Sequence, residues 1–235
     1  MLIQPEIRIG IPSKGRLKSS VEKFFKANGL NLIKNGRDRE YVLNFENRTD
    51  IQPVLINASD IPLEVRKGNI DLGITGKDLL YEKVSDWSKT VIEIRQLNFG
   101  FANLVIALPR FWVDVNTLDD LDDIAHFYRK KSSKRLKIAT KYQNLVREFF
   151  VTRELVDYQI VESQGATEGA IKNGLADVIA DITSTGETLS QNNLKLLNDG
   201  LILKSAATVF ANKDYLKKNK NNKSLKDFLR LTGSN

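Results

Sequence analysis

The segment from Gly174 to Leu189 constrains the fold of this chain more than any other part of the sequence. It reads GLADVIADITSTGETL, which is a small apolar run, an aspartate, a loop of hydroxylated residues and then helix-forming residues. A short apolar run that is bounded by turn residues and followed by a helix is typical of a buried parallel strand. The chain is therefore expected to be an α/β protein.

The same segment also indicates a kind of ligand. Ligands of open α/β sheets bind beyond the carboxyl ends of the strands. Hydroxyls and backbone N–H groups at a helix start suit a phosphate, and the carboxylate of Asp181 suits sugar hydroxyls. These residues predict a cradle for a phosphorylated ribose. A serine- and threonine-rich helix cap would have the same residues at 183–186, so both interpretations stay open at this point.

Composition narrows the class of protein. With 235 residues the chain is long enough for one large domain or two modest ones. It has no cysteine, which excludes disulfides, thiolate metal sites and a cysteine nucleophile. The first residues lack the pattern of a signal peptide, and no apolar run approaches the length of a membrane span. We expect a soluble, cytoplasmic protein with no membrane partner.

The net charge of +7 raises the possibility of nucleic-acid binding. The surplus lies at 129–137 and at 213–223, and neither cluster has the interleaved aromatic residues that stack on bases. A solvated charged face or a frayed tail is the favoured interpretation, so no nucleic-acid partner is predicted. A polyanionic substrate or an acidic partner subunit would also benefit from such a field.

Two other polar clusters favour structural roles. Asp119, Asp120, Asp122 and Asp123 crowd the expected start of a helix, where the helix dipole favours negative charge. His126 is the only histidine, and without companion ligands it is expected to be a packed or surface histidine rather than a catalyst or metal ligand. No metal-binding residue is assigned.

Strand-like and helix-like segments alternate along the chain, and one pattern occurs twice. Gly68-x-x-Asp71 and Gly174-x-x-Asp177 each lead into an apolar run and a Thr-Gly loop that opens a new helix. The repeat indicates two similar α/β lobes with a ligand cleft between them, although chance similarity of common turns is an alternative. Expected strands include 7–11, 52–56, 72–75, 104–108, 137–140, 158–161 and 178–180; the first helix is expected at 21–27, capped by Ser19 or Ser20.

The order of motifs resembles the short-form ATP phosphoribosyltransferases, which catalyse the first step of histidine biosynthesis. The stretches that carry the resemblance lie at 9–17 (IGIPSKGRL), 60–80, 138–145 (IATKYQNL), 162–189 and 199–212. Any one of them is a weak signal, but the ordered set covers nearly the whole chain. The resemblance implies that N1 of ATP attacks phosphoribosyl pyrophosphate, giving phosphoribosyl-ATP and pyrophosphate.

The resemblance also implies an architecture. The family has a two-lobed fold like that of type II periplasmic binding proteins, with the active site in the interlobe cleft. Residues 1–101 and 187–235 would form lobe I, and residues 102–186 would form lobe II with the phosphoribosyl pyrophosphate loop.

Roles for individual residues follow from the matched motifs. Transfer at an anomeric carbon requires charge placement and alignment more than a strong nucleophile. Asp181, Glu168 and Arg16 are the expected catalytic residues. The phosphoribosyl pyrophosphate site would use Asp181, Thr183, Ser184, Thr185, Gly186 and Thr188, and ATP or pyrophosphate would contact Lys14, Gly15, Arg16, Arg39 and Lys141.

The sequence departs from its relatives at two places. Many of them have an Arg-Pro pair before the position of Asp60, where this chain has Asn57, Ala58 and Ser59. An arginine contact to substrate is therefore missing there or comes from elsewhere. The phosphate loop also resembles that of the wider phosphoribosyltransferases, which often have two adjacent acids, but here Asp181 is followed by Ile182, so no two-acid ribose clamp is expected.

The resemblance further implies partners. Mg²⁺ would accompany the pyrophosphoryl group. A regulatory subunit resembling histidyl-tRNA synthetase would join the catalytic chain in a hetero-oligomer, and the catalytic chain would form homodimers. The alternative function is a cytosolic, two-lobed module that binds or senses a small ligand without catalysis.

Overall fold

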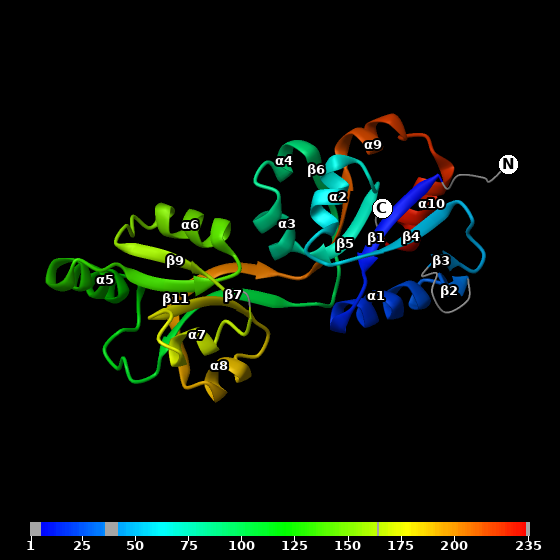
Figure 1. Ribbon diagram of the computed structural model, residues 1–235. Coiled ribbons are helices and arrows are strands. Elements are labelled where there is room, and N and C mark those ends of the chain that lie inside the picture. Colours follow the sequence, from blue (N-terminus) through cyan, green and yellow to red (C-terminus); the bar gives the residue numbers. More distant parts are fainter. Residues whose placement is uncertain (1–5, 36–41, 164, 234–235) are drawn as a thin grey trace. The chain divides into compact units, whose positions relative to one another are not determined.

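A computed structural model describes residues 6–35, 42–163 and 165–233 (Figure 1). The chain divides into two compact units. Unit 1 consists of Met1–Gly100 and Ala206–Asn235, and unit 2 of Phe101–Ser205. Each unit is built around a five-stranded sheet with helices packed against it. The expected α/β class is confirmed.

The sheet of unit 1 mixes parallel and antiparallel pairs. Its order is β4 (Ile51–Ile56), β1 (Ile7–Pro12), β5 (Leu72–Gly76), β12 (Ala207–Asn212) and β6 (Val91–Gln96). β1 is parallel to β4 and β5, whereas β12 is antiparallel to both of its neighbours. The remaining elements are α1 (Gly15–Ala27), the hairpin β2 (Leu32–Asn35) and β3 (Val42–Phe45), α2 (Ile61–Lys67), α3 (Lys77–Lys83), α4 (Trp87–Thr90), α9 (Lys213–Lys218) and α10 (Lys223–Leu231).

Unit 2 repeats this arrangement. Its sheet runs β9 (Tyr158–Glu162), β8 (Leu136–Thr140), β10 (Val178–Thr183), β7 (Ala102–Pro109) and β11 (Leu194–Ser205). β8 is parallel to β9 and β10, and β7 is antiparallel to β10 and β11. The helices are α5 (Leu118–Ser132), α6 (Gln143–Thr152), α7 (Gly169–Lys172) and α8 (Glu187–Gln191).

The repeated sequence pattern has the same structural use in both units. In unit 1 the backbone N–H of Arg8 donates to the Asp71 carboxylate at 2.7 Å. In unit 2 the backbone N–H of Lys137 donates to the Asp177 carboxylate at 2.8 Å. Each aspartate thereby fastens the start of its own strand to the neighbouring parallel strand. The common pairing order and these matching bonds support a repeated unit over chance similarity.

The core of unit 1 depends on one close approach. Phe210 of β12 is fully buried between helix and sheet residues that include Ile61 and Leu80. A Cβ atom at Gly73 would lie 2.6 Å from the Ile61 side chain and 2.9 Å from the Phe210 ring. Glycine in β5 therefore allows this aromatic ring to lie directly on the strand.

Three sequence-based expectations differ from the structure. The first helix begins at Gly15, with Lys14 at its N-cap, rather than after Ser19 or Ser20. The basic C-terminal segment is not a frayed tail: it forms α9 and α10, and Leu225 and Phe228 of α10 are buried. The expected return to lobe I at residue 187 is also wrong, because residues 187–205 belong to unit 2.

The later return has a physical cause. β11 pairs antiparallel with β7 and buries Leu194 and Leu197 in unit 2. The chain re-enters unit 1 only at Ala206, just before β12.

None of the described helices combines the length and the apolar character that a bilayer span requires.

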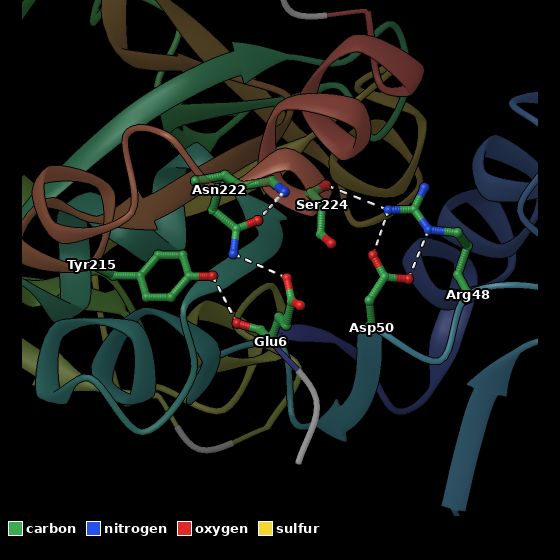
Figure 2. A network of polar contacts seen from close by, with 7 residues as sticks. Glu6, Arg48, Asp50, Tyr215, Asn222 and Ser224 are labelled. Carbon is green, nitrogen blue, oxygen red and sulfur yellow. Dashed lines mark hydrogen bonds and ion pairs between the residues drawn. The ribbon is translucent and has the colours of Figure 1, made fainter. Parts of the chain in front are cut away.

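Polar contacts fasten the C-terminal helices of unit 1 to its first strands (Figure 2). The Tyr215 hydroxyl donates to the Glu6 carbonyl at 2.9 Å, and the Asn222 amide donates to the Glu6 carboxylate at 3.0 Å. The Arg48 guanidinium donates two hydrogen bonds of 2.8 Å to Asp50 and reaches the Ser224 carbonyl at 3.4 Å. These contacts fix α9 and α10 against the unit.

The Arg48–Asp50 pair should make stability depend on pH. Hydrogen bonds from Arg48 hold the pKa of Asp50 below its usual value. Ionised Asp50 therefore stabilises the fold above its unfolded-state pKa of about 3.9, and that contribution is lost as pH falls through the folded-state pKa. We expect Asp50→Asn to lower the free energy of unfolding by about 1–2 kcal/mol at pH 7, with a difference from the natural chain that vanishes in acid.

Urea unfolding over a pH series measures this difference. Asp214→Asn is the matched control, since Asp214 pairs with Lys217 in an exposed contact and should change stability by less than about 0.5 kcal/mol. A loss at Asp50 that is equally large at acid and neutral pH would contradict the prediction.

Candidate functional site

Asp181 occupies a partly buried position in β10, which continues past it to Thr183. The backbone N–H of Ile182 donates to the Asp181 carboxylate at 2.8 Å. Burial raises the pKa of Asp181, and the nearby charge of Glu168 raises it further. The Ile182 N–H, the Thr167 hydroxyl and the charge of Lys141 act in the opposite direction.

The residues around Asp181 come from two elements that neighbour β10. Lys141 directly follows β8, the parallel neighbour of β10. Glu168 is the N-cap residue of α7, and Thr167 precedes it. Because β8 and β10 are adjacent and parallel, their carboxyl ends meet at one edge of the sheet. The structure thus brings together three of the predicted site residues: Asp181, Glu168 and Lys141.

Thr167 is a member of this cluster that sequence reasoning missed. It is fully buried, and its hydroxyl interacts with the Asp181 carboxylate and lowers the pKa of that acid. The one signal in the sequence that Thr167 belongs to the site was its position directly before Glu168, a predicted site residue.

The predicted phosphate loop follows β10 directly. The Thr183 hydroxyl accepts a hydrogen bond from the Gly186 N–H at 2.8 Å, and the Thr185 hydroxyl accepts one from the Glu187 N–H at 3.4 Å. Gly186 has φ +77°, and nothing lies within 4 Å of the position that a Cβ atom would take there. Hydrogen bonds to its own threonine hydroxyls therefore hold the loop in shape, and the space beside Gly186 is free of other protein atoms.

The helix after this loop is short. α8 has five residues, so the helix dipole contributes little to phosphate binding. Any affinity of the loop for a phosphate therefore depends on the N–H groups and hydroxyls of the loop. The side chains of Ser184, Thr185 and Thr188 are exposed. α7 and α8 cover the same face of the sheet (Figure 1), where Ala170 and Leu189 pack in one cluster.

The first copy of the Thr-Gly loop, in unit 1, has its polar groups occupied. The Thr75 hydroxyl donates to the Ala58 carbonyl at 3.0 Å. Lys77 forms an ion pair of 3.2 Å with Glu93. These contacts within the unit distinguish this copy from the loop at 183–188.

The other predicted site residues lie in unit 1 or outside the described residues. Lys14, Gly15 and Arg16 are exposed at the carboxyl end of β1, and neither cation forms an ion pair with a described residue. Gly15 has φ +78°, a conformation that glycine adopts without strain. Arg39 lies outside the described residues. At the position of the missing arginine, Asn57 donates to Ser59 at 2.9 Å.

The acidic cluster and the histidine have structural surroundings. The acidic cluster lies at the start of α5, as the sequence indicated, and Thr117 and Asp120 form a capping box there. His126 is largely exposed and lies 3.2 Å from Asp157. Among the residues described, no three histidine, aspartate or glutamate side chains gather where they could hold a metal ion.

A cavity of about 370 Å³ lies in unit 2 between α7 and the ends of β8 and β9. Its lining includes Ala139, Glu162, Ser163 and Asn173. The volume is within the range of small-molecule sites. None of the predicted site residues lines it, but Ala166 and Gly169 of its lining directly flank Thr167 and Glu168 of the Asp181 cluster.

Known proteins resemble this chain in sequence and in fold. ATP phosphoribosyltransferase of Cereibacter sphaeroides is 50% identical over 207 residues, which are 88% of each chain. Several other curated ATP phosphoribosyltransferases are 43–47% identical but longer, and the chain spans 63% of their length.

Solved structures agree on the fold. The ATP phosphoribosyl transferase (HisG:HisZ) complex from Thermotoga maritima matches with a TM-score of 0.73 at 24% identity, covering 96% of both chains. The periplasmic aliphatic sulphonate binding protein SsuA from Escherichia coli matches with a TM-score of 0.55 at 18% identity, covering 97% of this chain and 72% of that one. The fold is thus that of type II periplasmic binding proteins.

A family model settles the assignment of the chain. The model described as ATP phosphoribosyltransferase (HisG) matches residues 57–231, which include the repeated Thr-Gly loops and the Asp181 cluster. Together with the relative that is identical at half of the aligned positions, this match shows that the chain belongs to the ATP phosphoribosyltransferase family.

Proposed function

We propose that this chain carries out the reaction of its family, the transfer of the phosphoribosyl group of phosphoribosyl pyrophosphate to N1 of ATP. The main support is the cluster in unit 2, where a partly buried carboxylate lies in the strand that leads into a hydroxyl-rich loop. Such an arrangement suits a sugar phosphate, because the loop offers hydrogen bonds to the phosphate while the acid faces the sugar.

The loop at 183–188 would hold the 5′-phosphate of the substrate. Thr183, Ser184, Thr185 and Thr188 provide hydroxyls, and Gly186 leaves room for a phosphate oxygen to approach the backbone. An approaching phosphate would exchange the internal bonds of Thr183 and Thr185 for its own. This exchange keeps the N–H groups of the loop satisfied in both states.

Asp181 would accept hydrogen bonds from the ribose hydroxyls. As the bond to pyrophosphate breaks, positive charge develops on the ribose, and a fixed carboxylate stabilises it. Glu168 lies close enough to influence Asp181 and would add negative charge beside the same sugar. Lys141 has the charge that suits a pyrophosphate oxygen.

Unit 1 would contribute contacts to ATP or to pyrophosphate. Lys14 and Arg16 are exposed cations at a strand end, where phosphates bind in α/β folds. Gly15 allows the turn between them, and Arg16 would stabilise the leaving pyrophosphate. Arg39 is proposed for the same role from the sequence alone.

Mg²⁺ fits these residues as a companion of the pyrophosphate. The ion keeps several waters and is commonly held by substrate phosphates with one or two carboxylates, which Asp181 and Glu168 would provide. When bound, it would neutralise charge on the phosphate oxygens.

We also propose partners and a location. The chain would form homodimers and assemble with a regulatory subunit similar to histidyl-tRNA synthetase, which is supported by the fold match to a HisG:HisZ complex. ATP and phosphoribosyl pyrophosphate are metabolites of the cytoplasm, so we place the chain there.

The decisive test is incubation of the chain with ATP, phosphoribosyl pyrophosphate and Mg²⁺, with and without the regulatory subunit. We expect phosphoribosyl-ATP, detected by its absorbance and mass, and inhibition by histidine only when the subunit is present. No product in either mixture would contradict the enzyme and favour a module that binds without catalysis. Inhibition of the chain alone by physiological histidine would contradict the proposed division between subunits.

A further inference from the structure

The sheet of unit 2 ends in an edge strand, β9, that pairs with β8 and with no other described strand. The Leu136 N–H donates to the Asp157 carbonyl, and the Ser163 N–H donates to the Thr140 carbonyl. Because backbone groups alternate along a strand, those of residues 158, 160 and 162 point away from β8. Three N–H groups and three carbonyls thus face the open edge.

The equivalent edge of unit 1 is accompanied by further structure. β4 occupies the place of β9 in the repeated sheet order, and β3 of the β2–β3 hairpin lies beside it. Leu43 and Phe45 of this hairpin are buried in the core of unit 1 with Ile51 of β4. Among the described residues of unit 2, α6 leads directly to β9 without a hairpin between them, and no hairpin follows β9. The comparison of two otherwise matching sheets identifies β9 as the uncovered edge.

A groove of about 470 Å³ runs beside β9. Val151 and Val156 belong to its lining and are each 70% exposed, while Leu155 and Tyr158 form more deeply buried parts. Exposed valines next to an unpaired strand form an apolar surface of the kind that marks interaction sites. In contrast to β9, the opposite edge strand, β11, has two register shifts, which discourage pairing with another strand.

The charge of the groove selects its occupant. Arg135 and Arg147 are exposed lining residues, and no carboxylate belongs to the lining. A second copy of this chain pairing through β9 would bring the same arginines together, which like-charge repulsion disfavours. An acidic segment would instead meet complementary charge.

We propose that β9 and this groove bind an extended acidic segment of a partner protein, which adds a sixth strand to the sheet of unit 2. The backbone of the segment would bond to residues 158, 160 and 162. Alternate side chains would enter the groove, where apolar ones contact Val151 and Val156 and acidic ones contact Arg135 and Arg147. The surface is independent of the proposed reaction, because neither Asp181 nor the loop at 183–188 lines it.

Fluorescence anisotropy with a short labelled peptide of alternating glutamate and valine tests this surface at physiological salt. We expect saturable binding that weakens by about tenfold or more in Arg147→Glu. Lys130→Glu makes the same charge change at an exposed position outside the groove and should alter binding by less than about twofold. Arg135→Glu reverses the charge of the other arginine of the groove and is expected to weaken binding as well. Circular dichroism checks that each variant is folded.

A peptide with N-methylated backbone nitrogens at alternate positions separates strand addition from charge attraction. It keeps all side chains but loses its hydrogen-bond donors, so we expect binding at least about tenfold weaker. Three results would each overturn the proposal: equal binding of the natural and the N-methylated peptide, equal effects of Arg147→Glu and Lys130→Glu, or no saturable binding of the peptide. Tight binding of a labelled oligouridine that Arg147→Glu abolishes, without peptide binding, would identify a nucleic-acid site instead.

Discussion

Replacing Asp181 by asparagine is expected to lower kcat/KM for both substrates by about 100- to 1,000-fold while the chain stays folded. The carboxylate is held in β10 by its own strand, with the Ile182 N–H on one oxygen. An amide keeps the size of the side chain and removes its charge. The developing positive charge on the ribose would then lose its nearest fixed anion.

The same substitution should make the protein more stable. Burial raises the pKa of Asp181, so its ionised form costs folding free energy. A group with a raised folded-state pKa contributes stability at low pH that is lost as pH rises through that pKa. Asp181→Asn should therefore raise Tm at neutral pH, and the gain should fade below about pH 4, the unfolded-state range.

Asp177→Asn is the matched control for this experiment. Asp177 lies just before the same strand, but its carboxylate accepts the Lys137 N–H and fastens β10 to β8. We expect Asp177→Asn to lower Tm and to leave the activity per folded molecule within about twofold. Near-normal turnover of Asp181→Asn would show that the ribose lies elsewhere.

Replacing Phe210 by alanine should destabilise unit 1 by about 3–5 kcal/mol. The ring is fully buried in β12 and packs on Gly73 of β5 and on Ile61 of α2. Gly73 has no side chain that could move into the vacated space. The cavity would therefore persist, and its cost would be a large part of the stability of an ordinary domain.

Urea unfolding followed by tryptophan fluorescence measures this loss, with Trp87 in unit 1 and Trp112 in unit 2. Phe111→Ala makes the same chemical change at a residue that is 76% exposed, and it should alter stability by less than about 0.5 kcal/mol. Phe210→Leu should recover part of the loss. A cost below about 1 kcal/mol for Phe210→Ala would mean that the core collapses around the site.

Local patterns were sufficient for the parallel strands and for the repeat. The apolar runs at 7–11, 72–75 and 178–180 became β1, β5 and β10, since short buried strands bounded by turn residues carry their signal in a few neighbouring residues. The Gly-x-x-Asp pattern likewise marked the two aspartates that fasten these strands.

Antiparallel strands that return from elsewhere in the chain were harder to place. β11 has an irregular pattern with register shifts, and its role depends on pairing with β7, nearly a hundred residues earlier. The expected boundary at residue 187 failed for this reason. Thr167 was missed in the same way, because its hydroxyl is buried beside Asp181 only once α7 packs against β10.

The sequence by itself determined the α/β class, the repeat, the family resemblance and the position of Asp181 before a hydroxyl-rich loop. These depend on residues close together in the chain, whose periodicity and turn chemistry are local. Only the tertiary structure decided which residues surround Asp181, where the chain returns to unit 1, and that the β9 edge stays uncovered. Those properties arise from burial and strand pairing between distant segments, which no short stretch of sequence contains.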